Sequence, residues 1–94
     1  MKIVEHWFDG SHKTGSINGL MEADITKKLG LNPQRHGVND GDGKVAYEWS
    51  FTADGEECAI WEWKGGGRSG FHSAYGPSHV LRQIFGPNYK DGHL

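Results

Sequence analysis

Two runs of alternating apolar and polar residues flank Asp54-Gly55 in the segment from Lys44 to Lys64, KVAYEWSFTADGEECAIWEWK. A period of two is typical of strands that bury one face, because successive side chains point to opposite sides. An Asp-Gly pair between such runs is a strong signal for a hairpin turn. Three of the four tryptophans lie in this segment. It therefore predicts an aromatic β-hairpin around which the rest of the chain folds.

The length of the turn decides which face each ring takes. A two-residue loop would place Trp49 opposite Ile60 and would mix the apolar and polar faces of the two strands. A three-residue loop, Ala53–Gly55 with a bulge at the glycine, would instead pair Tyr47 with Trp61 and bring all the rings to one side. Because a slip of one residue inverts the faces of a strand, burial should select this second register. We therefore predict the three-residue loop.

The other predicted elements follow from turn residues and apolar spacing. A short strand is expected within 2–8, a helix over 20–29, a third strand over 71–75, and a second helix between Gly76-Pro77 and Gly86-Pro87. The segments 9–19 and 31–43 are expected to be loops, and 88–94 a frayed tail. The order (β)-α-β-β-β-α predicts an α+β fold with an antiparallel three-stranded sheet and two helices packed on its aromatic face.

Size and composition set limits on the class of protein. A chain of 94 residues and 10.4 kDa predicts a single domain over 1–94, with 1–19 and 87–94 loosely ordered. The net charge of −2 provides no strong electrostatic footprint for nucleic acid. One cysteine, Cys58, excludes an internal disulfide and fits a reducing cytosol. The chain shows neither a signal-peptide core nor an apolar run of membrane-spanning length, so we expect a cytoplasmic protein without membrane contact.

Known chemical motifs match poorly. The run NDGDGK at 39–44 resembles a calcium loop, but Lys44 and Val45 stand where a third oxygen ligand and a glycine are needed. The six histidines show no metal-ligand spacing. By strand parity Cys58 could lie near Glu48 and His72 as an activated nucleophile, yet nothing in the sequence brings them together. We therefore predict a protein that is not an enzyme and that uses no metal or cofactor.

A basic and aromatic edge offers a second kind of site. Lys64 and Arg68 lie next to Trp63 around a glycine-rich segment, 65–70. Bases stack on aromatic rings beside cationic groups in proteins that bind single-stranded nucleic acid. The same residue types are also favoured in protein interfaces. Nucleic-acid or nucleotide binding at this edge is thus the alternative hypothesis.

One resemblance adds a setting. The pattern YEWSFTADGEECAIWEWKGG, followed by HSAYGPSHVLRQIFG, resembles small bacteriophage proteins with a W-x-F-x-x-D-G-x-x-C-A-I-W hairpin and a helix opened by Gly-Pro. It covers 47–86, about half of the chain. The matched residues are explicable as core or turn positions. The resemblance therefore implies a phage origin and a fold, and it brings no catalytic residues.

These observations lead to a functional hypothesis. We expect a small protein-binding module, such as a phage accessory protein that inhibits a host protein complex, for example a defence system. The predicted contact surface is the side of the sheet opposite the rings, together with the start of the third strand and the glycine-rich segment. Its residues are Glu48, Ile60, Glu62, Lys64, Arg68 and His72.

Overall fold

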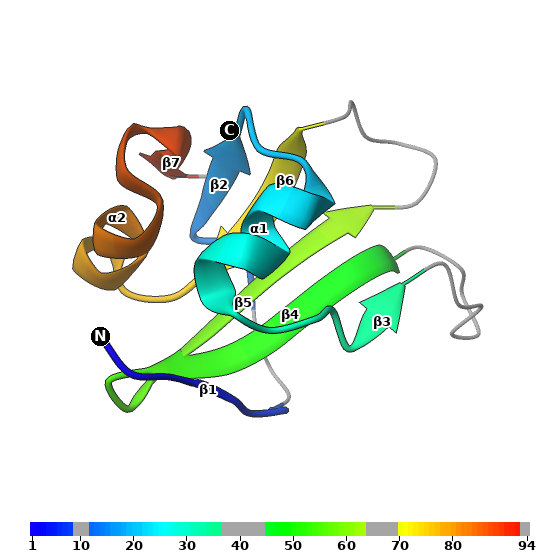
Figure 1. Cartoon of the computed structure of the whole chain (residues 1–94). Coiled ribbons are helices and arrows are strands. Elements are labelled where there is room, and N and C mark those ends of the chain that lie inside the picture. Colours follow the sequence, from blue (N-terminus) through cyan, green and yellow to red (C-terminus); the bar gives the residue numbers. More distant parts are fainter. Residues whose placement is uncertain (9–11, 37–44, 64–69, 93–94) are drawn as a thin grey trace.

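An antiparallel β-sheet with two short helices in front of it makes up the described part of the chain, residues 1–8, 12–36, 45–63 and 70–92 of a computed structural model (Figure 1). The elements are β1 (Ile3–Glu5), β2 (Gly15–Asn18), α1 (Glu22–Leu29), β3 (Arg35–His36), β4 (Val45–Ala53), β5 (Glu56–Trp63), β6 (Phe71–Tyr75), α2 (Ser78–Phe85), the 3-10 turn η1 (Gly86–Asn88) and β7 (Tyr89–Asp91).

The sheet is twice as wide as the sequence predicted. Its strands follow the order β1-β4-β5-β6-β2-β7, and β3 also pairs with β4. The fold has α+β character with two helices, but the predicted three-stranded sheet is wrong. The segments expected to be a polar loop and a frayed tail supply β2 and β7, which pair with each other. Neither strand has a partner near in sequence, so local patterns did not reveal them.

The hairpin turn has two residues, not the predicted three. Asp54 and Gly55 both have positive φ, 50° and 85°, as a type I′ turn requires. The resulting register places Trp49 opposite Ile60, and a shift near Val45 ends the regular pairing. Side chains directly opposite each other share a face. Ile60 therefore points to the same side as Trp49, and both are fully buried.

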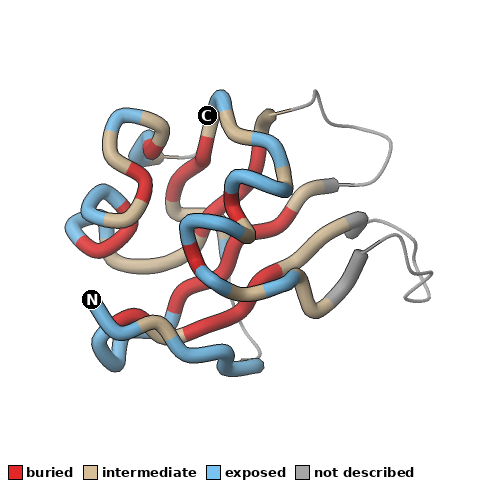
Figure 2. The backbone as a smooth tube through the Cα atoms, viewed as in Figure 1, coloured by how far each residue is buried: buried red, intermediate tan, exposed pale blue. Residues whose placement is uncertain are grey.

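The core fills the space between the sheet and the helices. We call this side of the sheet the helix face. Figure 2 shows buried positions along the central strands and on the inner sides of α1 and α2. The sheet contributes Ile17, Trp49, Phe51, Cys58, Ile60 and Ala74, while the helices contribute Ile25, Leu29, Val80, Leu81 and Phe85. Glu22 at the start of α1 accepts a hydrogen bond from Tyr47 and raises the pKa of that phenol, which is consistent with a position of α1 over β4.

The opposite side of the sheet is also partly covered, which the sequence did not predict. Phe8 and His12, which lie between β1 and β2 in the sequence, cover part of this side, here called the crossing face: the centroid of the Tyr75 ring lies 5.9 Å from that of Phe8 and 5.1 Å from that of His12. Small residues beneath it are buried, among them Ser16, Ser50, Ala59 and Ser73. Trp61 points to this side, since it pairs with Ser73. The predicted gathering of all rings on one face is therefore wrong.

One strand edge is completed by a side chain. β1 and β3 pair with separate parts of β4, at Ile3–Glu5 and Arg35–His36, and Ser50 lies between them, where its carbonyl oxygen accepts from the amide of His6 at 3.0 Å. The side-chain amide of Gln34 also bonds to Ser50. Its nitrogen donates to the carbonyl oxygen of Ser50 at 2.9 Å, and its oxygen accepts from the amide of Ser50 at 2.6 Å. The glutamine side chain thus hydrogen bonds as a peptide unit of a neighbouring strand would.

A carboxylate joins α2 to β7. Asp91 accepts hydrogen bonds from the hydroxyl of Ser78, from Tyr89 at 2.9 Å and from Arg82 at 2.7 Å. The bond from Ser78 is the main reason that the pKa of Asp91 is lowered, followed by the bond from Tyr89. These contacts hold the last strand of the sheet beside the helix that precedes it.

The network makes a pH-dependent contribution to stability. A lowered pKa in the folded state stabilises the protein above the ordinary value of 3.8, and this stabilisation is lost as the pH falls toward the folded value. We expect Asp91→Asn to lower the urea midpoint at pH 7. The difference from the unsubstituted protein should shrink as the pH falls below about 4. A difference that stayed constant from pH 7 to pH 2.5 would show that the charge of Asp91 is not involved.

Candidate functional site

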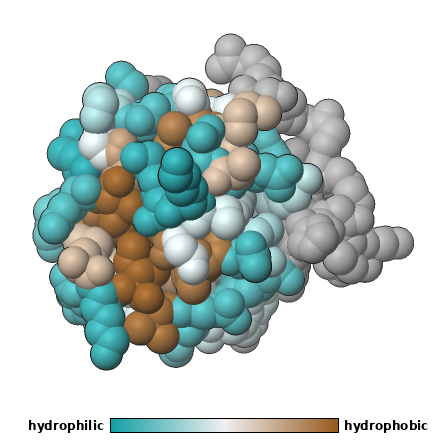
Figure 3. All heavy atoms as spheres, in the orientation of Figure 1, coloured by the Kyte–Doolittle hydropathy of each residue, from teal (hydrophilic) through white to brown (hydrophobic). Residues whose placement is uncertain are grey.

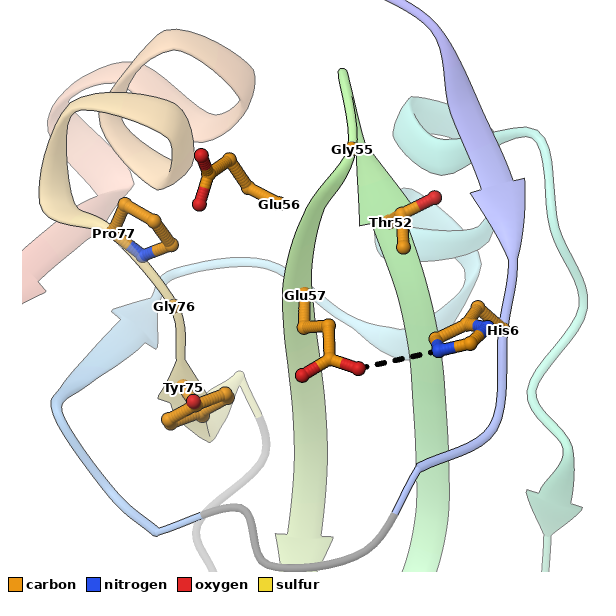
Figure 4. Close-up of a pocket in the computed structure, with 8 residues that line it drawn as sticks. All are labelled: His6, Thr52, Gly55, Glu56, Glu57, Tyr75, Gly76 and Pro77. Atoms are coloured by element: carbon orange, nitrogen blue, oxygen red, sulfur yellow. Dashed lines mark hydrogen bonds and ion pairs between the residues drawn. The ribbon is translucent and has the colours of Figure 1, made fainter.

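A hollow of about 630 Å³ lies on the crossing face, at the end of the sheet that carries the β4–β5 turn. It forms where β6 separates from β5, because their last paired residues are Ala59 and Tyr75 and the chain then turns into α2. Its volume lies within the range of about 300–1,000 Å³ that is usual for ligand sites. The lining residues are His6, Thr52, Gly55, Glu56, Glu57, Tyr75, Gly76 and Pro77 (Figure 4).

A hydrogen bond between a histidine and a carboxylate spans one side of the hollow. The Nε2 atom of His6 lies 3.2 Å from Oε2 of Glu57, and both side chains are about half exposed. The two residues lie along the two edges of β4, because Thr52 of β4 pairs with Val4 of β1 on one edge and with Glu57 of β5 on the other. The pair therefore bridges β1 and β5 over the strand between them, as Figure 4 shows. At this exposure it contributes little to stability, and its position over the sheet is what matters.

A tyrosine ring forms another wall. Tyr75 ends β6 and is partly exposed. Phe8 and His12, which lie between β1 and β2 in the sequence, pack against its ring, and Phe8 also stacks on His6 at 5.9 Å. The aromatic wall is thus held by contacts from a distant part of the chain. A ring fixed in this way offers a flat apolar surface at little cost in conformational entropy.

The charge of the lining has one dominant sign. The described lining residues include two glutamates, Glu56 and Glu57, and one histidine, His6, but no lysine or arginine. The described lining therefore offers carboxylates and neither an ammonium nor a guanidinium group. Such a surface attracts cationic groups.

The predicted contact residues do not form one surface. The register places Glu48 opposite Trp61 and Glu62 opposite Tyr47, so the two glutamates lie on opposite faces of the sheet. Ile60 was expected to point outward, but it is fully buried in the core. That expectation depended on the three-residue turn, and the observed turn inverts it.

His72 is likewise not available on the surface. It is 1% exposed, its Nε2 donates to the carbonyl oxygen of Leu20 at 2.8 Å, and its ring meets Trp49 edge-on. Lys64 and Arg68 lie outside the residues that the structure describes, so their part of the predicted surface is not placed. The segments 39–44 and 65–69 lie outside the described residues as well.

The hypothetical cysteine nucleophile is not assembled. Cys58 is fully buried, and burial raises the pKa of its thiol to about 12. Because Ile60 pairs with Ala74, Cys58 and His72 are four residues apart along the strand direction, roughly 13 Å. A thiol with such a pKa is not a nucleophile at neutral pH. Cys58 acts as a small core residue.

The described residues show neither a metal site nor a membrane-spanning helix. They include no group of three or more histidine, cysteine, aspartate or glutamate side chains arranged to hold a metal ion. No helix among them has the length and apolar character needed to cross a membrane.

Sequence reasoning missed the hollow because its walls come from β1, β4, β5 and β6. His6 meets Glu57 only through two successive strand pairings. One local signal was present: Gly76-Pro77 marks the point where a strand must leave the sheet. From sequence, this pair was interpreted only as a signal for the start of a helix.

Comparisons of the chain with protein-family models, with curated proteins and with solved structures found no match. The resemblance to bacteriophage proteins therefore stays a prediction.

Proposed function

We propose that this chain is a non-enzymatic protein-binding module and that the hollow is the centre of its contact surface. The observation that carries the proposal is the half-exposed, hydrogen-bonded pair of His6 and Glu57 beside the Tyr75 ring in a concave site. Aromatic residues in pockets, bordered by polar groups, are typical centres of protein interfaces. The burial of Cys58 and His72, the residues considered for nucleophilic catalysis, also favours binding over catalysis.

The contact surface extends beyond the hollow. A standard interface takes about 800 Å² from each partner, more than a single hollow of this size supplies. The neighbouring strand β1 provides additional surface, since Val4 is 44% exposed and Trp7, just after the strand, is 46% exposed. Exposed apolar residues next to a polar concave site are suited to such a contact. We therefore include β1 in the proposed surface.

The class of partner is proposed from the sequence. The resemblance to small bacteriophage proteins favours a host protein complex as the partner, and an accessory inhibitor of that complex, such as an inhibitor of a defence system, as the role. Binding of nucleic acid through Trp63, Lys64 and Arg68 is the alternative that the experiment below must separate.

Filling the hollow should abolish partner binding. In Thr52→Tyr a large side chain replaces a small one that lines the hollow, whereas Thr26→Tyr makes the same change in a second hollow beside α1. Both proteins are used for affinity purification from bacterial lysate with and without nuclease, and the captured protein is identified and tested again after purification. We expect Thr26→Tyr to retain a nuclease-resistant partner and Thr52→Tyr to lose at least about 90% of it, a tenfold loss.

Two outcomes would contradict the proposal. Loss of every captured protein after nuclease treatment would favour nucleic acid, and a steep decrease of binding with salt would support that reading. Equal capture by the two variants would show that the hollow is not the contact surface. The fold of each variant is checked beforehand from the urea midpoint.

A further inference from the structure

The ligand chemistry of the hollow can be narrowed further if its role in protein binding is accepted. We propose that the hollow receives the guanidinium group of an arginine side chain carried by the partner. This inference rests on the proposed function and adds the group that is recognised. It is argued from the carboxylate of Glu57, the ring of Tyr75 and the charge of the lining.

The carboxylate of Glu57 is placed to accept a hydrogen bond from a second donor in addition to His6. One oxygen, Oε2, accepts from His6 at 3.2 Å. Figure 4 shows the other oxygen pointing away from His6, toward the side of the hollow where Tyr75 lies. An arginine there can donate to this oxygen with one arm of its planar fork. Charge-assisted bonds of this kind are about twice as strong as neutral ones.

Tyr75 supplies a second contact that depends on the shape of the cation. Guanidinium groups stack on aromatic faces, whereas the ammonium group of lysine is a compact and strongly hydrated point charge. The Tyr75 ring is held by Phe8 and His12, so it does not need to be ordered when a ligand binds. The pairing of a carboxylate with a fixed ring therefore favours arginine over lysine.

The rest of the lining contributes charge. Glu56 also lines the hollow, near Pro77 (Figure 4), but it pairs with Ala53 and so belongs to the helix face, which leaves Glu57 as the carboxylate beside Tyr75. The described lining residues include no lysine or arginine that would repel the incoming cation. The second hollow provides a comparison, because its described lining has one carboxylate, that of Glu22, and no aromatic ring. The carboxylate of Glu57 beside an aromatic ring distinguishes the proposed site from it.

An apolar strip lies on the surface of the helix face. Figure 3 shows hydrophobic residues gathered between α2 and the N-terminal strand on the helix face. Ile3 and Ile84 are partly buried against the core, and Met1 is 48% exposed. Nothing in the structure shows what covers this apolar strip, and it carries no proposal.

A model compound tests the inference directly. Nα-acetyl-arginine-N-methylamide is titrated into the ¹⁵N-labelled protein, with the citrulline compound as the neutral isostere and the lysine compound as the other cation. We expect the arginine probe to shift the amide signals of His6, Glu57 and Tyr75. The citrulline probe should bind at least about tenfold more weakly, the equivalent of 1.4 kcal/mol, and the lysine probe should fall between the two.

Two variants with equal net charge provide the control. Glu57→Gln removes the carboxylate from the hollow, while Glu5→Gln removes one from β1, where the side chain points to the helix face because it pairs with Phe51. Glu57→Gln should weaken the arginine probe about tenfold, and Glu5→Gln by less than about twofold. Equal binding of arginine and citrulline, or equal effects of Glu57→Gln and Glu5→Gln, would overturn the inference.

Binding of the protein partner to the three variants tests this inference separately from the function on which it rests. If Thr52→Tyr loses the partner and Glu57→Gln retains it, the hollow binds a protein but does not recognise a cation, so the inference is wrong and the proposed function stands. If neither Thr52→Tyr nor Glu57→Gln loses the partner, the proposed function itself is contradicted. Loss of the partner in both, with retention in Glu5→Gln, supports both.

Discussion

Replacing Gly15 with alanine should lower the free energy of unfolding by about 3 kcal/mol. Gly15 lies in β2, between β6 and β7, where it pairs with Ala74 and Asp91. A β-carbon at this position would lie 2.5 Å from the backbone oxygen of Lys90 and 2.7 Å from the hydroxyl oxygen of Tyr89. Because a backbone atom cannot move aside as the end of a side chain can, the strands would have to separate. The urea midpoint measures the effect.

The same substitution at Gly30 is the control. Gly30 ends α1 with a φ of 72°, and nothing lies within 4 Å of an added β-carbon. Gly30→Ala should therefore cost only the left-handed conformation, about 1 kcal/mol. Tyr89→Phe in the Gly15→Ala background should recover less than half of the loss, since the contact with the Lys90 backbone remains. Equal costs at the two glycines would show that β2 and β7 are not packed as described.

Replacing Trp49 with alanine should cost about 4 kcal/mol. Trp49 is fully buried at the centre of the helix face. Its ring meets His72 edge-on at 6.3 Å, and its Nε1 donates to the carbonyl oxygen of Leu31 at 3.2 Å. The alanine would leave a large cavity and an unpaired carbonyl. Far-UV circular dichroism during urea unfolding measures the loss without relying on tryptophan emission.

Phenylalanine at the same position separates packing from hydrogen bonding. Trp49→Phe retains most of the ring volume but loses the donor to Leu31, so it should cost about 1–2 kcal/mol. The difference between the two variants then reports the cavity. If Trp49→Ala cost less than about 1 kcal/mol, the ring could not be part of the core, because truncation of a buried tryptophan costs several times more.

The parts of the fold that could be predicted from sequence are those with local signals. The two helices and β6 lie where apolar spacing and the Gly-Pro pairs indicated, within two residues. β2 could not be predicted, because the sequence Gly-Ser-Ile-Asn lacks alternating apolar residues. Its glycine is explained only by the backbone of β7 beside it. Strands of this kind are determined by partners distant in sequence.

The turn shows how a reasonable criterion can select the wrong register. Gathering all the rings on one face assumed that only one face is buried. Part of the crossing face is covered as well, so Trp61 can be buried on the side of the sheet that faces away from Trp49. Burial then does not disfavour the two-residue turn, which Asp54-Gly55 prefers locally. The residues of β5 that the assumed register placed outward, Cys58, Ile60 and Glu62, therefore lie on the same side of the sheet as Trp49, whereas Glu48 stays on the other side.

The candidate site was still less accessible to prediction. His6 and Glu57 are 51 residues apart in the chain. Their meeting depends on the pairing of β1 with β4, which the sequence did not indicate. Tyr75 belongs to a strand that was predicted correctly, while Thr52 and Glu57 belong to hairpin strands that were predicted with the wrong register. A site assembled from four strands requires the sheet order first.

The amide of Gln34 has a consequence for solubility. β4 is nine residues long and rich in aromatic residues, and a strand of this kind with an open edge is a template for aggregation. Three separate pieces of chain close its outer edge: β1, the Gln34 side chain and β3. None of them is long or regular enough to recruit another strand in its turn. The protein thus ends this side of the sheet with short pieces of chain that a second molecule cannot extend.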